Sequence, residues 1–88
     1  MEAKKHLGTI TILVKDRQTH AQDVQRILTD NGHLILARLG VNAQRACIEH
    51  CTGIIAIMVE GTVREINTLA KQIDGLYGIV AKAVIATE

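Results

Sequence analysis

Residues 53–66 read GIIAIMVEGTVREI, and they place a strand directly before a helix. The first eight residues are mostly aliphatic, which is typical of a strand that is buried on both faces. Thr62 and Glu65 follow at the spacing of a capping box, in which each side chain binds the backbone N–H of the other residue. The stretch therefore predicts a strand over residues 53–60, then a helix that starts after Thr62 and stops at Gly75.

Outward from this stretch, the chain shows the periods of one more helix and three more strands. Residues 7–15 alternate apolar and polar side chains, the period of a strand. A helical repeat of apolar side chains follows, with Thr19 as its expected N-cap and Gly32 as its expected left-handed C-cap. Two further strands are expected at residues 33–42 and 77–86.

The order of these elements is βαββαβ, the order of the ferredoxin-like fold. We therefore predict an α+β protein with a four-stranded antiparallel sheet and two helices on one face. The handedness of crossover connections places the first and third strands in the centre and the second and fourth at the edges. With 88 residues, no linker and no low-complexity segment, residues 1–88 are expected to form one domain.

The second and third strands are apolar on both of their faces. In the second strand the residues expected to face the core are Ile35, Ala37, Leu39 and Val41, and those expected to face away are Leu34, Leu36, Arg38 and Gly40. In the third strand the residues expected to face away are Ile54, Ala56 and Met58. Helices would cover one face only, so these residues predict a homodimer or homotetramer that forms through the open face. Alternatively, some of them are ordinary isolated apolar residues on the surface.

Composition excludes several classes of function. Ten Lys and Arg stand against nine Asp and Glu, for a net charge of +1, and the basic residues are scattered along the chain. No direct binding to nucleic acid is therefore expected, because such binding needs a gathered basic surface. The polar start of the chain fits neither a signal peptide nor a membrane span. We expect a cytoplasmic protein that contacts no membrane and whose two cysteines are thiols.

Four stretches carry the pattern of a known family: residues 16–18 (DRQ), 38–41 (RLGV), 53–66 and 69–73 (LAKQI). In these the chain resembles the iron-only hydrogenase system regulator family, over roughly residues 6–85. The resemblance implies an ACT-like fold, related to the ligand-binding half of the nickel-responsive repressor, and an oligomeric, regulatory and non-catalytic protein. It implies no known ligand. The chain departs from the pattern at Asn42, where a proline is usual, and in the cysteine-containing loop that follows.

The loop between the second and third strands holds the densest group of side chains that can bind a metal. Cys47, His50 and Cys51 offer two thiolates and an imidazole, which suit Zn²⁺, Ni²⁺ or iron. A complete site needs about four ligands, so a second subunit, His33 or His6 would have to contribute. The alternatives are a redox-responsive thiol pair and an ordinary loop.

Three further residues are candidates for binding a ligand. Arg38 is expected on the open face, where its planar fork of donors could hold a carboxylate or phosphate, or where it could simply extend into water. Asp16 and Arg17 lie in the turn before the first helix, whose backbone N–H groups favour an anion. Plain capping of the helix is the other interpretation of that turn.

The expected function is therefore a small regulatory or sensor domain that acts as a homo-oligomer, in iron-only hydrogenase regulation or maturation. It would act through a partner protein or a small ligand, and the sequence identifies no cofactor. No nucleophile stands with a base and an orienting group, so an enzyme is not expected. The alternative is a metal-binding protein that uses Cys47, His50 and Cys51.

Overall fold

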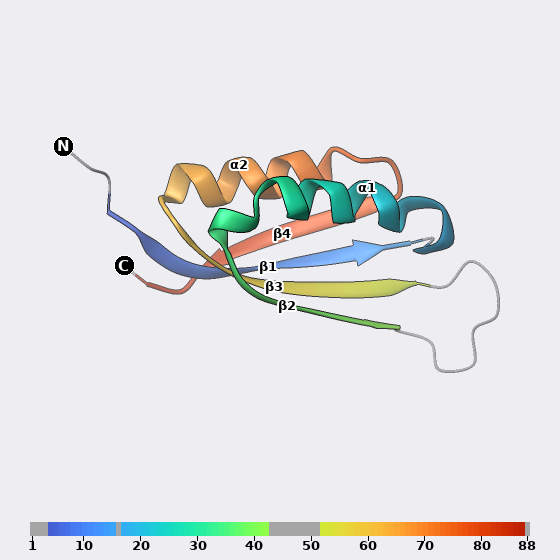
Figure 1. Cartoon of the computed structure of the whole chain (residues 1–88), viewed down its shortest axis with the longest axis horizontal. Helices are drawn as coiled ribbons and strands as arrows, with labels where there is room; N and C mark the ends of the chain where they lie inside the picture. Colours follow the sequence, from blue (N-terminus) through green and yellow to red (C-terminus); the bar gives the residue numbers. More distant parts are fainter. Residues whose placement is uncertain (1–3, 16, 43–51, 88) are drawn as a thin grey trace.

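The structure, a computed structural model, describes residues 4–15, 17–42 and 52–87, with the backbone alone for residues 17–19 and 42 (Figure 1). The elements, in chain order, are β1 (His6–Val14), α1 (Arg17–Asp30), the short 3-10 helix η1 (Gly32–Leu34), β2 (Ile35–Asn42), β3 (Gly53–Gly61), α2 (Val63–Asp74) and β4 (Ile79–Ile85).

The four strands form an antiparallel sheet in the order β2-β3-β1-β4. Figure 1 shows both helices on the same face of this sheet. The ferredoxin-like α+β fold is confirmed, with β1 and β3 in the centre and β2 and β4 at the edges, as the crossover rule predicted. One face of the sheet is thus covered by helices, and we call the other the open face.

The core lies between the sheet and the helices and consists of aliphatic side chains. Those that are fully buried include Ile10, Ile12, Val14, Val24, Ile57, Val59, Ile66 and Ile73. Every second residue of β1 and β3 enters this core, because side chains alternate between the two faces of a strand. These two central strands therefore set the position of everything attached to the edges.

The N-terminal end of α2 is closed by the predicted capping box. The Glu65 N–H donates to Thr62 Oγ1 at 3.1 Å, and the Thr62 N–H donates to Glu65 Oε1 at 2.8 Å. The bond from the Thr62 backbone is the main reason why the pKa of the Glu65 carboxyl lies below its ordinary value of 4.5. The helix stops where predicted, with the Gly75 N–H donating to the Lys71 carbonyl at 3.0 Å.

The ends of α1 differ from the prediction. The helix begins at Arg17, so Thr19 lies inside its first turn and is not the N-cap. At the other end, the backbone N–H and the Nδ2 of Asn31 both donate to the Ile27 carbonyl, at 3.1 and 2.8 Å. The Ile27 carbonyl at the end of α1 thus already accepts two hydrogen bonds. Gly32 begins η1 and does not adopt the predicted left-handed conformation. The start of the following strand consequently shifts from residue 33 to residue 35.

The short helix η1 also changes the position of Leu34. This side chain was expected on the open face, but it is only 7% exposed and belongs to the core. It lies in the last position of the 3-10 turn, before the strand begins. The turn therefore directs Leu34 inward regardless of the alternation that follows in β2.

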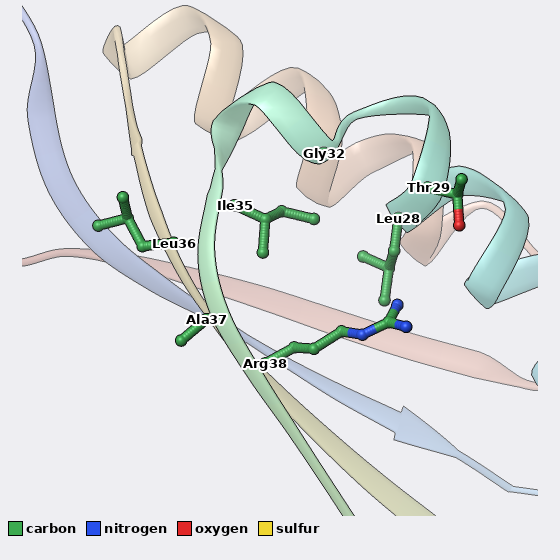
Figure 2. A pocket seen from close by; sticks show the side chains of 7 residues that line it. All are labelled: Leu28, Thr29, Gly32, Ile35, Leu36, Ala37 and Arg38. Carbon is green, nitrogen blue, oxygen red and sulfur yellow. The ribbon is translucent and has the colours of Figure 1, made fainter.

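A β-bulge interrupts β2 near its start. The register of its pairing with β3 shifts between Ile35 and Ala37, so Leu36 is the extra residue. Figure 2 shows Leu36 and Ala37 on the same side of the strand, whereas Ile35 and Arg38 turn toward α1. Two consecutive residues on one side are what a bulge produces, and the alternation beyond it is shifted by one.

This shift reverses the predicted orientation of β2 beyond the bulge. Leu39 and Val41 were expected in the core, but they are 67% and 51% exposed and pair beside the outward residues of β3. Arg38, expected on the open face, lies on the helix-covered side instead. The physical reason is that a strand has a period of two, so one inserted residue moves every later side chain to the opposite face.

Candidate functional site

The open face of the sheet carries a group of exposed apolar side chains from all four strands: Leu7, Leu39, Val41, Ala56, Met58 and Val84. Leu39, Val84 and Met58 are 67%, 62% and 58% exposed. The prediction that Ala56 and Met58 of β3 face away from the core is confirmed. The pattern is that of an interaction surface, because soluble proteins rarely leave apolar side chains this closely grouped in water.

Between β2, β3 and β1 the open face is slightly hollowed. A depression of about 160 Å³ is lined mainly by Thr9, Ala37, Leu39, Ala56 and Met58. Its lining is almost entirely apolar, so a partner that fills it would gain chiefly from the removal of hydrocarbon from water. The face can therefore receive an apolar side chain from another molecule.

A second surface feature lies on the opposite, helix-covered side, where α1 passes over the edge strand. We call it the α1–β2 groove, a cavity of about 310 Å³ lined by Leu28, Thr29, Gly32, Ile35, Leu36, Ala37 and Arg38. In Figure 2 the side chains of Leu28, Ile35 and Arg38 enter the space between helix and strand. Further along the same two elements, a smaller hollow of about 150 Å³ includes Gln25 and Gly40 in its lining.

Arg38 links the strand to the helix. Its Nη1 donates to Oε1 of Gln25 on α1 at 2.7 Å, between side chains that are both exposed. The acceptor is a neutral amide, so this bond orients the guanidinium without neutralising its charge. Arg38 thus presents a positive charge at the α1–β2 groove.

The other predicted site residues fall outside the described residues. Asp16, Cys47, His50 and Cys51 are not among them, and only the backbone of Arg17 is described, as the first residue of α1. The metal loop and the anion-binding turn therefore stay predictions. Within residues 4–15, 17–42 and 52–87, no group of three or more His, Cys, Asp or Glu side chains is arranged to hold a metal ion. In the same residues, no helix is both long and apolar enough to cross a membrane.

Sequence reasoning missed two parts of these surfaces. It placed Leu39 and Val41 in the core, and it did not single out Gln25 as the partner of Arg38. The run from Leu34 to Ala37 is uniformly apolar, so it contains no alternation that could reveal the bulge. A weak signal was available, because the expected alternation left the charged Arg38 among aliphatic residues on the open face.

The fold and the exposed sheet define a small ferredoxin-like α+β protein with an unpartnered apolar face. The model of the TM1266-like family (Iron-only hydrogenase system regulator, putative) matches residues 6–83, and the chain belongs to this family. The resemblance seen in the sequence is confirmed. No curated protein matches the chain.

Solved structures with the same fold include one from Thermotoga maritima. That protein, the uncharacterized TM1266, matches with a TM-score of 0.82 at 24% identity, over 96% of this chain and 100% of that one. CPII from Thiomonas intermedia K12, a nitrogen regulatory PII-like protein solved with ADP, AMP and bicarbonate, matches with a TM-score of 0.52 at 11% identity. The match covers 98% of this chain and 99% of CPII. At these identities the likeness concerns the fold alone.

Proposed function

We propose that this chain is a non-catalytic regulatory domain that assembles with copies of itself through the open face, in the iron-only hydrogenase system. The observation that carries the proposal is the apolar open face. A regulatory rather than catalytic role is supported by the family's description as a regulator. We place the protein in the cytoplasm, where it would act on a partner protein or respond to a small ligand.

A second copy of the chain is the occupant that best suits the open face. Among the described residues of the four strands, the face carries one acidic side chain, Glu60 of β3, and one basic side chain, Lys82 of β4. The two charges of each face cancel, so two identical faces would meet without net electrostatic repulsion. In a dimer with a two-fold axis, Glu60 of each copy would lie at the surface of the other copy. Apolar residues rimmed by a few polar ones are also the usual composition of interfaces between identical subunits.

The regulatory mechanism would follow from the exposure of the open face in a single copy. A chain of 88 residues gains part of its stability from association, since small domains bury a smaller fraction of their surface. Any ligand that favours the assembled form then shifts both stability and oligomeric state by mass action. This coupling makes a small protein of this fold suitable as a sensor.

Sedimentation equilibrium with Leu39→Glu tests the assembly. The wild-type protein should be a dimer or tetramer at micromolar concentration, and Leu39→Glu should be largely monomeric with unchanged far-UV circular dichroism, because a charge there would be buried without a partner. Val63→Glu is the matched control, since Val63 is also apolar and exposed but lies on α2. A monomeric wild-type protein, or equal dissociation by Val63→Glu, would show that the open face is not the interface.

The hydrogenase role needs a separate measurement. Deletion of the gene in its host should change hydrogenase activity or maturation, and complementation with wild-type protein should restore it. Complementation with Leu39→Glu should fail if assembly is needed for regulation, whereas Val63→Glu should complement. Unaltered hydrogenase activity in the deletion strain would refute the role and leave the assembly result standing.

A further inference from the structure

The α1–β2 groove combines an apolar wall with a cationic end. Leu28 of α1 and Ile35 of β2 point into it from opposite sides, as Figure 2 shows. The side chains of Leu36 and Ala37 turn away to the other side of the strand, so these two residues offer the groove mainly their backbone. The groove is thus open to solvent, with backbone and polar groups along one part, an apolar side chain at Ile35 and a positive charge where Arg38 lies.

The cationic end exists because of the bulge in β2. With regular alternation from Ile35 onward, the next residue on the helix side would be Ala37, and Arg38 would lie on the open face. The inserted Leu36 instead turns Arg38 toward α1, where Gln25 holds its Nη1 at 2.7 Å. Bulges are often found where a side chain must be re-aimed toward a functional site.

The charge of Arg38 has no counter-ion among the described residues. The ion pair that the described side chains form joins Arg26 to Asp23 on the outer part of α1, at 3.4 Å. No aspartate or glutamate lines the groove. A guanidinium has five N–H donors in a planar fork that matches a carboxylate or phosphate, and one bond to Gln25 leaves most of them available.

We infer that the α1–β2 groove binds a small amphipathic oxyanion, whose carboxylate or phosphate is held by Arg38 and whose short apolar chain lies against the half-buried side chain of Ile35. The cavity volume of about 310 Å³ is at the lower end for ligand pockets, so the ligand is small. The hydroxyl of Thr29, at the rim, is a further donor for the oxyanion or its bound water. This site is separate from the open face, so it goes beyond the proposed assembly and does not depend on it.

Two-dimensional amide NMR on the full chain tests the inference, with hexanoate, hexyl phosphate and hexylammonium as probes. Hexanoate or hexyl phosphate should give saturable shifts at residues 28–38 below about 10 mM, as expected for a millimolar Kd. Stronger binding of one of the two identifies the carboxylate or the phosphate as the preferred head group. Hexylammonium should cause no saturable shift, because it has the same apolar chain but carries a positive charge, as Arg38 does.

Variants distinguish binding at the α1–β2 groove from nonspecific association with the protein. Arg38→Gln should weaken binding by about tenfold or more, because hydrogen bonds to charged groups are the stronger ones. Arg26→Gln is the matched control, because Arg26 is an exposed arginine of the bordering helix α1 that does not line the groove, and this variant should bind as the wild-type protein does. Arg38→Lys should bind with intermediate affinity, since it keeps the charge and loses the fork.

A second variant tests the apolar part without touching Arg38. Gly32 lines the groove and a Cβ added to it would meet no atom within 4 Å, so Gly32→Leu adds a side chain at the groove wall without a clash at its Cβ. Gly32→Leu should weaken the binding of both hexanoate and hexyl phosphate. The inference is overturned if neither oxyanion binds saturably, if the shifts map elsewhere, if hexylammonium binds equally well, or if Arg38→Gln and Arg26→Gln behave alike.

Discussion

The two edges of the sheet are attached to their helices in different ways. On the α2–β4 side, the Ala81 N–H of the edge strand donates to Asp74 Oδ1 at the end of the helix, at 2.9 Å. On the α1–β2 side, the described hydrogen bond between helix and edge strand joins the exposed side chains of Arg38 and Gln25. One edge is therefore held through its backbone, and the other through two long side chains.

The burial of the two helices follows the same division. Helix α2 buries four residues, Ile66, Leu69, Ala70 and Ile73, whereas α1 buries Val24 and Leu28 among its described side chains. Both sides carry a surface hollow, of about 240 Å³ between α2 and β4 and about 310 Å³ at the α1–β2 groove, but a cationic side chain lines the strand side of the latter alone among the described residues. The α2–β4 side therefore supplies more of the buried core, and the α1–β2 side carries the groove and contributes Leu39 and Val41 to the open face.

The largest expected effect comes from the same substitution, leucine to alanine, made in each of the two helices. Leu69 on α2 and Leu28 on α1 are each 1% exposed. Leucine to alanine in a core costs about 2–5 kcal/mol, more where a closed cavity remains. We expect Leu69→Ala at the upper end and Leu28→Ala at about 2 kcal/mol, because α2 buries four residues and α1 buries two among its described side chains. Urea unfolding measures both free energies, and a larger loss for Leu28→Ala would contradict the comparison.

A pair of glycines gives the next effect. Gly78 has a φ of 76°, and a Cβ there would lie 2.8 Å from Cδ2 of His20. Gly78→Ala should therefore cost about 1–3 kcal/mol of strain. Gly32→Ala, on the groove side, meets no atom within 4 Å and should be neutral or stabilise by about 0.4–1 kcal/mol. Melting temperatures that fall equally for both variants would show that Gly32 is as constrained as Gly78.

Removal of the α2 cap should have a smaller effect. Thr62→Ala leaves the Glu65 N–H without its acceptor and should lower the free energy of unfolding by about 1 kcal/mol. Thr62→Ser keeps the acceptor oxygen and should restore most of the loss. Thr29→Ala is the control on α1, where the side chain is exposed, and little change is expected. Chemical denaturation of the three variants checks this order.

The smallest effect is the pH dependence of the same cap. The pKa of Glu65 is lowered in the folded state from 4.5, so its ionised form stabilises the fold. This contribution is fully present above pH 4.5 and is lost as the pH falls through the lower folded pKa. Because Glu65 is fully exposed, the change should be small. The stability difference between wild-type protein and Glu65→Gln should therefore shrink below pH 4.5, and a constant difference would contradict it.

The sequence by itself determined the order of elements and the sheet. The period of two in residues 7–15 and the capping box of Thr62 and Glu65 are local signals, because each depends only on residues a few positions apart. They placed β1, β3 and α2 within one or two residues of where the structure has them. The crossover rule then gave the strand order without knowledge of any contact. The central strands of the fold were therefore readable from the chain.

Only the tertiary structure decided what the edge strand β2 presents on each side. The bulge at Leu36 depends on how β2 pairs with β3, a contact between residues far apart in the chain, and the apolar run before it fits either register. That single inserted residue moves Leu39 and Val41 onto the open face and turns Arg38 to Gln25. The side-chain orientation beyond a bulge cannot be derived from the alternation of residues, because the period-two pattern of a strand does not show where an extra residue is inserted.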